Sequence, residues 1–177
     1  MYQLTPFEPM GIELSIRANL AWEDDCLELN FVIDGEIALI DLPESNSSKE
    51  RILGLWESTC FELFIKDANS SKYLEFNFSA SGDWNCYAFE HYRSDLNEYL
   101  PMKSSALKML NKHSKNTYNY QVIIDTTQLP EAFKQVGQRM LGLSAVIKIG
   151  DELSYWALKH PQNKPDFHSE AGFSIVL

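Results

Sequence analysis

Three polar side chains that could hold a small polar ligand fall on one face of two neighbouring predicted strands. Glu62 lies in the run from Thr59 to Lys66, and Glu75 and Asn77 lie in the run from Tyr73 to Ala80. Because side chains alternate along a β-strand, all three are expected on the face opposite the apolar residues. Carboxylates and amides pair well with hydroxyl groups, so this polar row predicts a binding surface for a small polar molecule.

Two tryptophans border this polar row. Trp56 precedes the first strand, and Trp84 begins a third predicted strand, which ends at Tyr92 and also carries Asn85. A polar face edged by indole rings suits a ligand that has both apolar C–H faces and hydroxyl groups. The commoner role of such a tryptophan is core packing, and strand carboxylates are more often solvated on an open sheet face.

The elements that must position these residues are mostly short strands. Alternation, or a high content of β-branched and aromatic residues, predicts further strands at Ile12–Leu20, Cys26–Ile33, Glu36–Ile40, Tyr118–Asp125, Leu143–Ile149, Leu153–Leu158 and Phe173–Leu177. Asp34-Gly35 predicts a hairpin turn. Short helices are expected at Ser104–Leu110 and after Leu129-Pro130, and the rest of Arg93–Asn116 is expected to be irregular. This pattern predicts an all-β fold, an antiparallel β-sandwich of two packed sheets, jelly-roll-like, with one or two short helices.

The chain has 177 residues, of which 45% are hydrophobic, and is expected to form a single domain, 1–177, with a sizeable core. The apolar strand residues expected in that core are Phe61, Leu63, Ile65, Leu74, Phe76 and Phe78. The formal net charge of -10 would repel phosphate backbones and anionic lipid heads, so neither nucleic acid nor a membrane surface is expected as a partner. Protein partners are not indicated.

The three cysteines, Cys26, Cys60 and Cys86, are far apart and lie among apolar neighbours in predicted strands. Buried, reduced thiols are therefore expected, and no CxxC spacing indicates a cysteine-based metal site. The first residues lack the pattern of a secretory signal, and no segment reaches membrane-spanning length. On these grounds the protein is expected to be cytoplasmic.

Four runs in the second part of the chain resemble, in their order, the family 9 carbohydrate-binding modules and their DOMON-like relatives. They are LWESTCFELFI, YLEFNFSASGDWNCYAF, YQVIIDTTQL and YWALKHPQNKPDFHSEAGFSIVL. In those modules a tryptophan lies shortly before an acidic strand, and a second one precedes a proline-containing loop. Trp56 with Glu62 matches the first feature, and Trp156 with Pro161 and Pro165 matches the second.

The resemblance implies a β-sandwich that binds a sugar between the indoles of Trp56 and Trp156. Together with the polar row, the expected ligand-binding residues are Trp56, Glu62, Glu75, Asn77, Trp84, Asn85, Trp156 and His160. The chain departs from the family pattern in the segment ALKH after Trp156 and in the run Asp166, Phe167 and His168, which has no counterpart there. The expected function is non-catalytic binding of a carbohydrate or a similar small polyhydroxylated molecule, without a cofactor.

Two alternatives and one ion site remain open. Some DOMON-like relatives hold b-type haem, for which the candidate ligands are Met10, Met102, Met109, Met140, His91, His160 and His168. No haem-attachment motif occurs, and core packing is the simpler role of the methionines. A glycoside-acting enzyme would need paired carboxylates such as Glu62 and Glu75. A structural calcium ion would suit Asp151, Asp166 or the turn DANSS.

Overall fold

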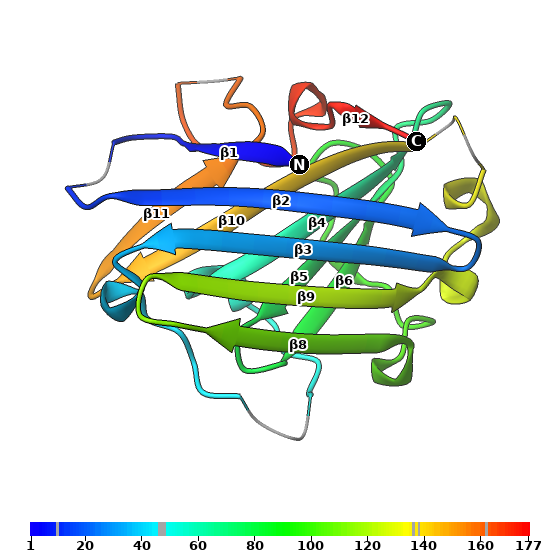
Figure 1. Ribbon diagram of the computed structural model, residues 1–177. Helices are drawn as coiled ribbons and strands as arrows, with labels where there is room; N and C mark the ends of the chain where they lie inside the picture. The colour runs from blue at the N-terminus through cyan, green and yellow to red at the C-terminus, as the bar shows by residue number, and fades with distance from the viewer. Residues whose placement is uncertain (10, 46–48, 136, 138, 162) are drawn as a thin grey trace.

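The computed structural model describes residues 1–9, 11–45, 49–135, 137, 139–161 and 163–177. Within them, the strands form one continuous antiparallel sheet of twelve strands that folds over into two layers (Figure 1). The layer that we call sheet A contains β2 (Leu14–Glu23), β3 (Cys26–Gly35), β9 (Thr117–Asp125) and β8 (Leu107–His113). Sheet B lies behind it and contains β11 (Glu152–Ala157), β10 (Arg139–Ile149), β4 (Cys60–Asp67), β5 (Tyr73–Ser79), β6 (Trp84–Phe89) and β7 (Asn97–Glu98).

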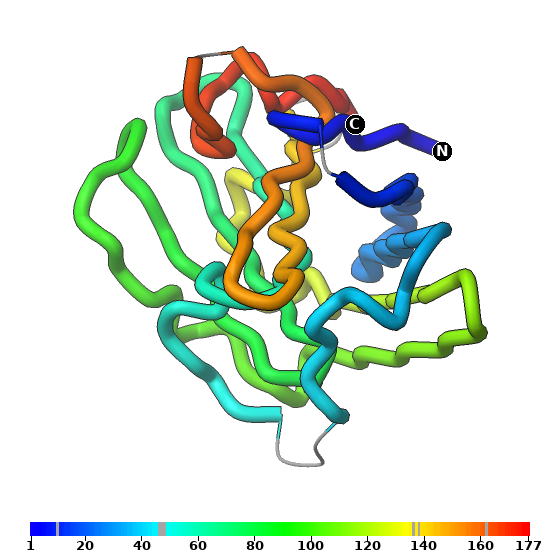
Figure 2. The backbone as a smooth tube through the Cα atoms, turned by 90° about the vertical axis from the view of Figure 1, so that its left-hand side faces the viewer, coloured from blue at the N-terminus to red at the C-terminus, as the bar shows by residue number. Residues whose placement is uncertain are grey.

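The first strand joins the two layers. In β1 (Tyr2–Pro6), the first half pairs with β2 of sheet A and the second half pairs with β11 of sheet B. The short strand β12 (Ile175–Val176) adds to β10. Figure 2 shows the layers from the side, with the blue strands of sheet A on the right and the teal and green strands of sheet B on the left. The predicted antiparallel sandwich is confirmed.

The helices of the described residues are all three-residue 3-10 turns, more in number than the one or two expected. They are η1 (Ile37–Leu39), η2 (Leu55–Glu57), η3 (Ser104–Ala106), η4 (Thr126–Gln128), η5 (Glu131–Phe133) and η6 (Glu170–Gly172). No helix among these residues has the length and apolar character needed to cross a membrane.

The main core lies between the two sheets. Phe61, Leu63, Ile65, Leu74, Phe76 and Phe78 are all fully buried there, as the alternating pattern predicts. Phe61 of sheet B stacks on Tyr120 of sheet A, with 4.8 Å between the ring centroids. Burial of such aromatic side chains is the dominant source of stability in a sandwich of this kind.

The outer face of sheet B is also covered, which the sequence pattern does not predict. Every residue of β5, and every residue of β4 except the last, is buried. The cover includes the chain that follows β11, whose Phe173 packs against Gly142 of β10. A Cβ atom at Gly142 would lie 2.7 Å from the Phe173 ring, so glycine is what allows this segment to sit close to the sheet.

Three local predictions are wrong. The run Glu36–Ile40 is not a strand but contains η1, and Asp34-Gly35 is not a hairpin turn because both residues belong to the end of β3. Gly35 serves another purpose, since a Cβ atom there would lie 2.1 Å from the carbonyl oxygen of Glu13. The segment expected to be irregular after Arg93 contains β7 and β8. Strand β8 is a mostly exposed edge strand, so it lacks an apolar alternation that would mark it.

Cys26 corrects the expectation that all three cysteines are buried. All three are free, and Cys60 and Cys86 are buried, but Cys26 is exposed. It is the first residue of β3 and pairs with Glu23 directly after the tight turn at Asp24 and Asp25. A residue at the tip of a hairpin lies beyond the reach of the core, whatever its polarity.

Candidate functional site

A pocket of about 550 Å³ opens on the outer face of sheet B. Its floor comes from β4, β5 and β10, and its walls come from η2, the chain after β6, β11 and the chain after β11. The lining residues are Trp56, Glu57, Glu62, Phe64, Glu75, Phe89, Arg93, Ser94, Leu96, Val146, Leu153, Tyr155, Pro165, Phe167 and His168. Pockets of this size commonly hold small-molecule ligands.

Strand register brings the two floor carboxylates together. Glu62 of β4 pairs with Asn77 of β5, and Glu75 of β5 pairs with Phe64 of β4, so the two glutamates are diagonal neighbours on one face. Diagonal neighbours of this kind are on the order of 7–8 Å apart. On the other side of β4, the hydroxyl of Ser144 donates to Oε2 of Glu62 at 2.8 Å. The alternation of two adjacent strands therefore determines this pair directly.

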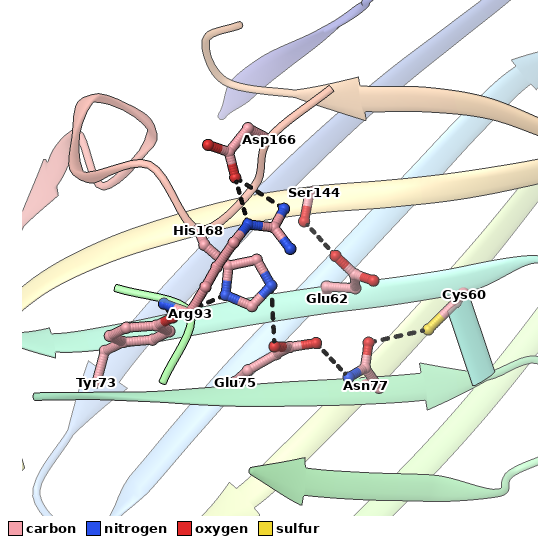
Figure 3. Close-up of polar contacts among 9 residues, drawn as sticks. All are labelled: Cys60, Glu62, Tyr73, Glu75, Asn77, Arg93, Ser144, Asp166 and His168. Carbon is pink, nitrogen blue, oxygen red and sulfur yellow. Dashed lines mark hydrogen bonds and ion pairs between the residues drawn. The ribbon is translucent and has the colours of Figure 1, made fainter. Parts of the chain in front are cut away.

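A chain of polar contacts connects Glu75 with His168 and Tyr73 (Figure 3). The Tyr73 hydroxyl accepts from the backbone N–H of Arg93 and lies 2.8 Å from Nδ1 of His168. It can therefore donate to Nδ1, which leaves the His168 proton on Nε2. Nε2 faces Oε2 of Glu75 at 3.6 Å, and the Asn77 amide donates to Oε1 of Glu75 at 2.7 Å.

Arg93 and Asp166 form the rim next to His168. The guanidinium of Arg93 donates twice to Oδ1 of Asp166, at 2.9 and 3.2 Å, and the Tyr92 hydroxyl donates to Oδ2. Burial opposes ionisation of Asp166, but these hydrogen bonds outweigh it and lower its pKa. Arg93 has a φ of 48°, a left-handed conformation that costs a non-glycine residue about 1–2 kcal/mol, and its contacts to Tyr73 and Asp166 hold it there.

Glu62 and Glu75 on the floor, and His168 beside them, favour their neutral forms. Burial, reinforced by the charge of Glu75, raises the pKa of Glu62 to about 8, against the hydrogen bond from Ser144. Burial also raises the pKa of Glu75 to about 7, although the Asn77 hydrogen bond and the Arg93 charge oppose it. Burial and the charge of Arg93 lower the pKa of His168 to about 4. Near neutral pH the two glutamates are therefore partly protonated and His168 is uncharged.

Aromatic rings form much of the pocket wall. Trp56 is half-buried on η2, and its ring meets that of Tyr87 edge-on, with the centroids 5.8 Å apart. Phe64 and Phe89 pack edge-on against the His168 ring, with centroids 5.5 and 5.2 Å away. The site therefore combines a polar floor with apolar, aromatic sides.

Of the residues predicted for the site, Trp56, Glu62 and Glu75 all line this one pocket. Asn77 does not line it but lies fully buried beside Glu75, where its side-chain oxygen also accepts from the thiol of Cys60. Its role in the structure is to orient the Glu75 carboxylate.

Trp84 and Asn85 do not line the pocket. Trp84 pairs with Phe78 on the core face of sheet B and is 2% exposed, and its indole N–H donates to the carbonyl of Lys49. The Asn85 amide accepts from Arg51 and donates to the Ile52 carbonyl and to Glu98. It thereby fixes the chain that precedes η2.

The expectation that Trp56 and Trp156 face each other across a pocket is wrong. Trp156 pairs with Ala145 and points into the main core, where it is 3% exposed. Its neighbour Tyr155 occupies the pocket wall instead, because successive strand residues point to opposite faces. His160 is also outside the pocket and packs beside Phe7, with Nε2 2.8 Å from the carbonyl of Thr5.

Sequence reasoning missed His168 and Arg93 as site residues. Both lie outside regular strands, where no periodicity indicates direction, and both reach the pocket through tertiary packing. The run Asp166, Phe167 and His168 was the available signal, since it departs from the family pattern and supplies three pocket or rim residues.

Among the described residues, no group of three or more His, Cys, Asp or Glu side chains could hold a metal ion. Asp166, a candidate calcium ligand, is engaged by Arg93 and Tyr92. Of the candidate haem ligands, Met10 lies outside the described residues, and Met102 and Met109 pack in the main core.

Comparison with known proteins finds likeness only in structure, since neither a protein-family model nor a curated protein matches the chain. A candidate carbohydrate-binding protein from Bacteroides uniformis superposes with a TM-score of 0.62 at 12% identity, over 98% of this chain and 84% of that one. A family 9 carbohydrate-binding module from Caldicellulosiruptor kristjanssonii in complex with cellotriose gives 0.50 at 10% identity, over 88% of this chain and 71% of that one. The chain therefore has a fold that carbohydrate-binding modules share, whereas its likeness to DOMON domains stays a prediction.

Proposed function

We propose that this chain binds a small polyhydroxylated ligand, a carbohydrate, in the pocket on the outer face of sheet B, and that it does so without catalysis. The observation that carries the proposal is the placement of Glu62 and Glu75 on the floor, with His168 beside them, in a pocket of about 550 Å³ whose walls are largely apolar and aromatic. A sugar needs both kinds of surface, because its C–H faces stack on rings while its hydroxyls require hydrogen-bond partners.

The floor can both donate and accept hydrogen bonds. A protonated glutamic acid donates through its O–H and accepts through its other oxygen, and the Nε2–H of His168 is a further donor. Hydroxyl groups also donate and accept, so a neutral floor matches a neutral sugar without leaving a buried charge uncompensated. Trp56 and Tyr155 supply ring surface at the sides.

The fold comparisons support the same ligand class. One of the similar structures is a complex with cellotriose, and the other is a candidate carbohydrate-binding protein. Neither likeness transfers particular residues, because the second tryptophan expected from the resemblance lies in the core of this chain. The proposal depends on the pocket itself.

A thermal-shift screen of mono- and oligosaccharides tests the proposal. A sugar at a hundred times its dissociation constant should stabilise the protein by about 2.7 kcal/mol. Trp56→Ala should abolish the shift, and the matched control Glu28→Gln, on the exposed face of sheet A, should retain it. A shift that survives Trp56→Ala unchanged would place the ligand elsewhere.

One observation favours a second candidate function, an enzyme acting on glycosides. Glycosidases use two carboxylic groups, one of them with a raised pKa, and Glu62 and Glu75 form such a pair on the pocket floor. Incubation with chromogenic aryl glycosides decides between the two. Turnover that is lost in both Glu62→Gln and Glu75→Gln would establish the enzyme and remove the non-catalytic proposal.

A further inference from the structure

The two floor glutamates have no cation in contact, although cations lie nearby. Arg93 lines the pocket, but its guanidinium is hydrogen bonded to Asp166. Lys66 follows Glu62 on the same face of β4, and its ammonium contacts the Ser70 carbonyl and Glu170. Among the described residues, no lysine or arginine nitrogen lies within 4.0 Å of a carboxylate oxygen of either Glu62 or Glu75.

Each of the two carboxylates also keeps an oxygen without a close donor. Ser144 donates to Oε2 of Glu62, and the described residues offer Oε1 no hydrogen bond. Asn77 donates to Oε1 of Glu75, and Oε2 has only Nε2 of His168 at 3.6 Å. Glu62 is 3% exposed and Glu75 is 5% exposed, yet both line the pocket. Neither oxygen is among the fully enclosed atoms without a partner, so each can accept a hydrogen bond from a ligand in the pocket.

The remaining surroundings also suit a positive charge. The walls present the rings of Trp56, Phe64, Phe89, Tyr155 and Phe167, and Glu57 adds a third carboxylate at the edge. Aromatic faces attract cations, and this attraction is strongest where water is excluded. The chain as a whole has a formal net charge of -10, which raises the local concentration of cationic ligands.

We propose that the ligand of this pocket carries an ammonium group, as an amino sugar does, and that the ammonium lies between the carboxylates of Glu62 and Glu75. The inference rests on the proposed function, since it assigns a substrate class to the same site. An ammonium group has three N–H donors, enough for Oε1 of Glu62, Oε2 of Glu75 and one further acceptor. A neutral sugar can pair with the protonated acids, whereas an ammonium group also supplies a counter-charge to their ionised forms.

Binding of the ammonium group then releases one proton from the glutamate pair. The ligand keeps its three ammonium protons, and the proton held by the glutamate pair leaves for the buffer, so the total charge of the site is conserved. The titratable and charged groups around the pair are Glu57 on η2, Cys60 and Lys66 on β4, Tyr73 on β5, Tyr87 on β6, Arg93 after β6, Tyr155 on β11, and Asp166 and His168 after β11. With its pKa near 4, His168 stays uncharged between pH 5 and pH 7.

Titration calorimetry with glucosamine, glucose and N-acetylglucosamine tests the inference. These probes share a ring and differ in having an ammonium, a hydroxyl or a neutral amide at one carbon. At pH 7 glucosamine should bind at least about tenfold more tightly than the two neutral sugars. Its affinity should fall up to about a hundredfold between pH 7 and pH 5, because one proton must leave the pair for each ligand bound while the amine stays charged, and the affinity for glucose should not change.

Two variants identify the groups responsible. Glu62→Gln and Glu75→Gln keep the side-chain shape but cannot provide a negative charge, so each should remove the advantage of glucosamine over glucose and its pH dependence. Glu28→Gln on sheet A is the matched control and should behave as the wild type. Calorimetry in buffers of different ionisation enthalpy should record a proton released on glucosamine binding to the wild type and a smaller release with either pocket variant.

The outcomes separate the inference from the proposed function. Equal affinities for glucosamine and glucose, both lost in Trp56→Ala, would overturn the ammonium site and leave the sugar-binding site intact. An advantage of glucosamine that persists in both pocket variants would also overturn it. If none of the three sugars binds, the proposed sugar site fails, and this inference fails with it.

Discussion

On both sheets of this molecule an asparagine amide donates to a glutamate two residues earlier, but the pKa of the glutamate shifts in opposite directions. On β3 the Asn30 amide donates to Glu28 two residues earlier, at 2.9 Å, and on β5 the Asn77 amide donates to Glu75 two residues earlier, at 2.7 Å. Hydrogen bonds from Asn30 and Gln121 lower the pKa of Glu28, whereas burial raises the pKa of Glu75 to about 7. The hydrogen bond is common to both, so burial is what reverses the shift.

The difference arises from what covers each sheet. In β3 and β9 of sheet A, buried and more exposed residues alternate, as expected for a sheet with one face in water. In β4 and β5 of sheet B nearly every residue is buried, because η2 and the chain after β11 pack over the outer face. A polar strand face thus becomes a buried site only where another part of the chain covers it.

The largest expected effect concerns two phenylalanines on opposite faces of sheet B. Phe76→Ala in the main core should cost about 3–5 kcal/mol of unfolding free energy. If the outer face is truly covered, Phe64→Ala should cost about 3 kcal/mol or more as well, since Phe64 is buried against Phe173. Urea denaturation measures both. A cost below about 1 kcal/mol for Phe64→Ala would mean that the outer face behaves like that of sheet A.

Two tryptophans test the difference between the main core and the pocket. Trp156→Ala should also destabilise the protein by about 3–5 kcal/mol because it empties part of the core, and it should affect ligand binding only through stability. Trp56→Ala removes a half-buried pocket wall and should cost about 1 kcal/mol while it abolishes binding. Denaturation and ligand titration on both variants check this. The opposite ranking would show that Trp56 is the structural residue.

The pH dependence of stability should differ between glutamates of the two sheets. The folded pKa of Glu62 is raised from 4.5 to about 8, so the native state binds more protons than the unfolded state, and stability is present at low pH and lost as pH rises from 4.5 to 8. Glu62→Gln should make this decline shallower by up to about 1.4 kcal/mol per pH unit. The pKa of Glu28 is lowered, so its contribution to stability is present above pH 4.5 and is lost only as pH falls below it; Glu28→Gln should therefore leave the slope between pH 5 and pH 8.5 unchanged.

Unfolding free energies at intervals between pH 5 and pH 8.5 provide the test. The histidines are common to the wild type and both variants, so the difference between the curves reports the replaced glutamate, together with Glu75 in the case of Glu62. Identical slopes for wild type and Glu62→Gln would mean that water reaches this carboxylate freely, as it reaches Glu28.

The smallest effect, without any change in stability, distinguishes the thiols. Cys26 at the hairpin tip of sheet A should react rapidly with a thiol reagent in the folded protein. Cys60 and Cys86 lie within sheet B, where burial raises the pKa of both thiols, and they should react only on unfolding. Counting labelled groups by mass spectrometry checks this. Rapid labelling of Cys60 would contradict the burial of this thiol within sheet B.

Part of the candidate site could be predicted because strand alternation is a local property. The pattern around Phe61 and Phe76 identifies the core face of β4 and β5, and it therefore places Glu62 and Glu75 together on the other face. It could not show that this face is covered, since the cover comes from η2 and from residues after β11 that have no periodicity.

The sequence by itself determined the all-β class, the central strands and the shared face of the two glutamates, because a period of two depends only on neighbouring residues. The tertiary structure decided which aromatic residues reach the pocket, turning Tyr155 toward it and Trp156 into the core. It also brought His168 and Arg93 to the floor glutamates and buried those carboxylates. Burial depends on segments distant in the chain, and it is burial that sets the charge of the site.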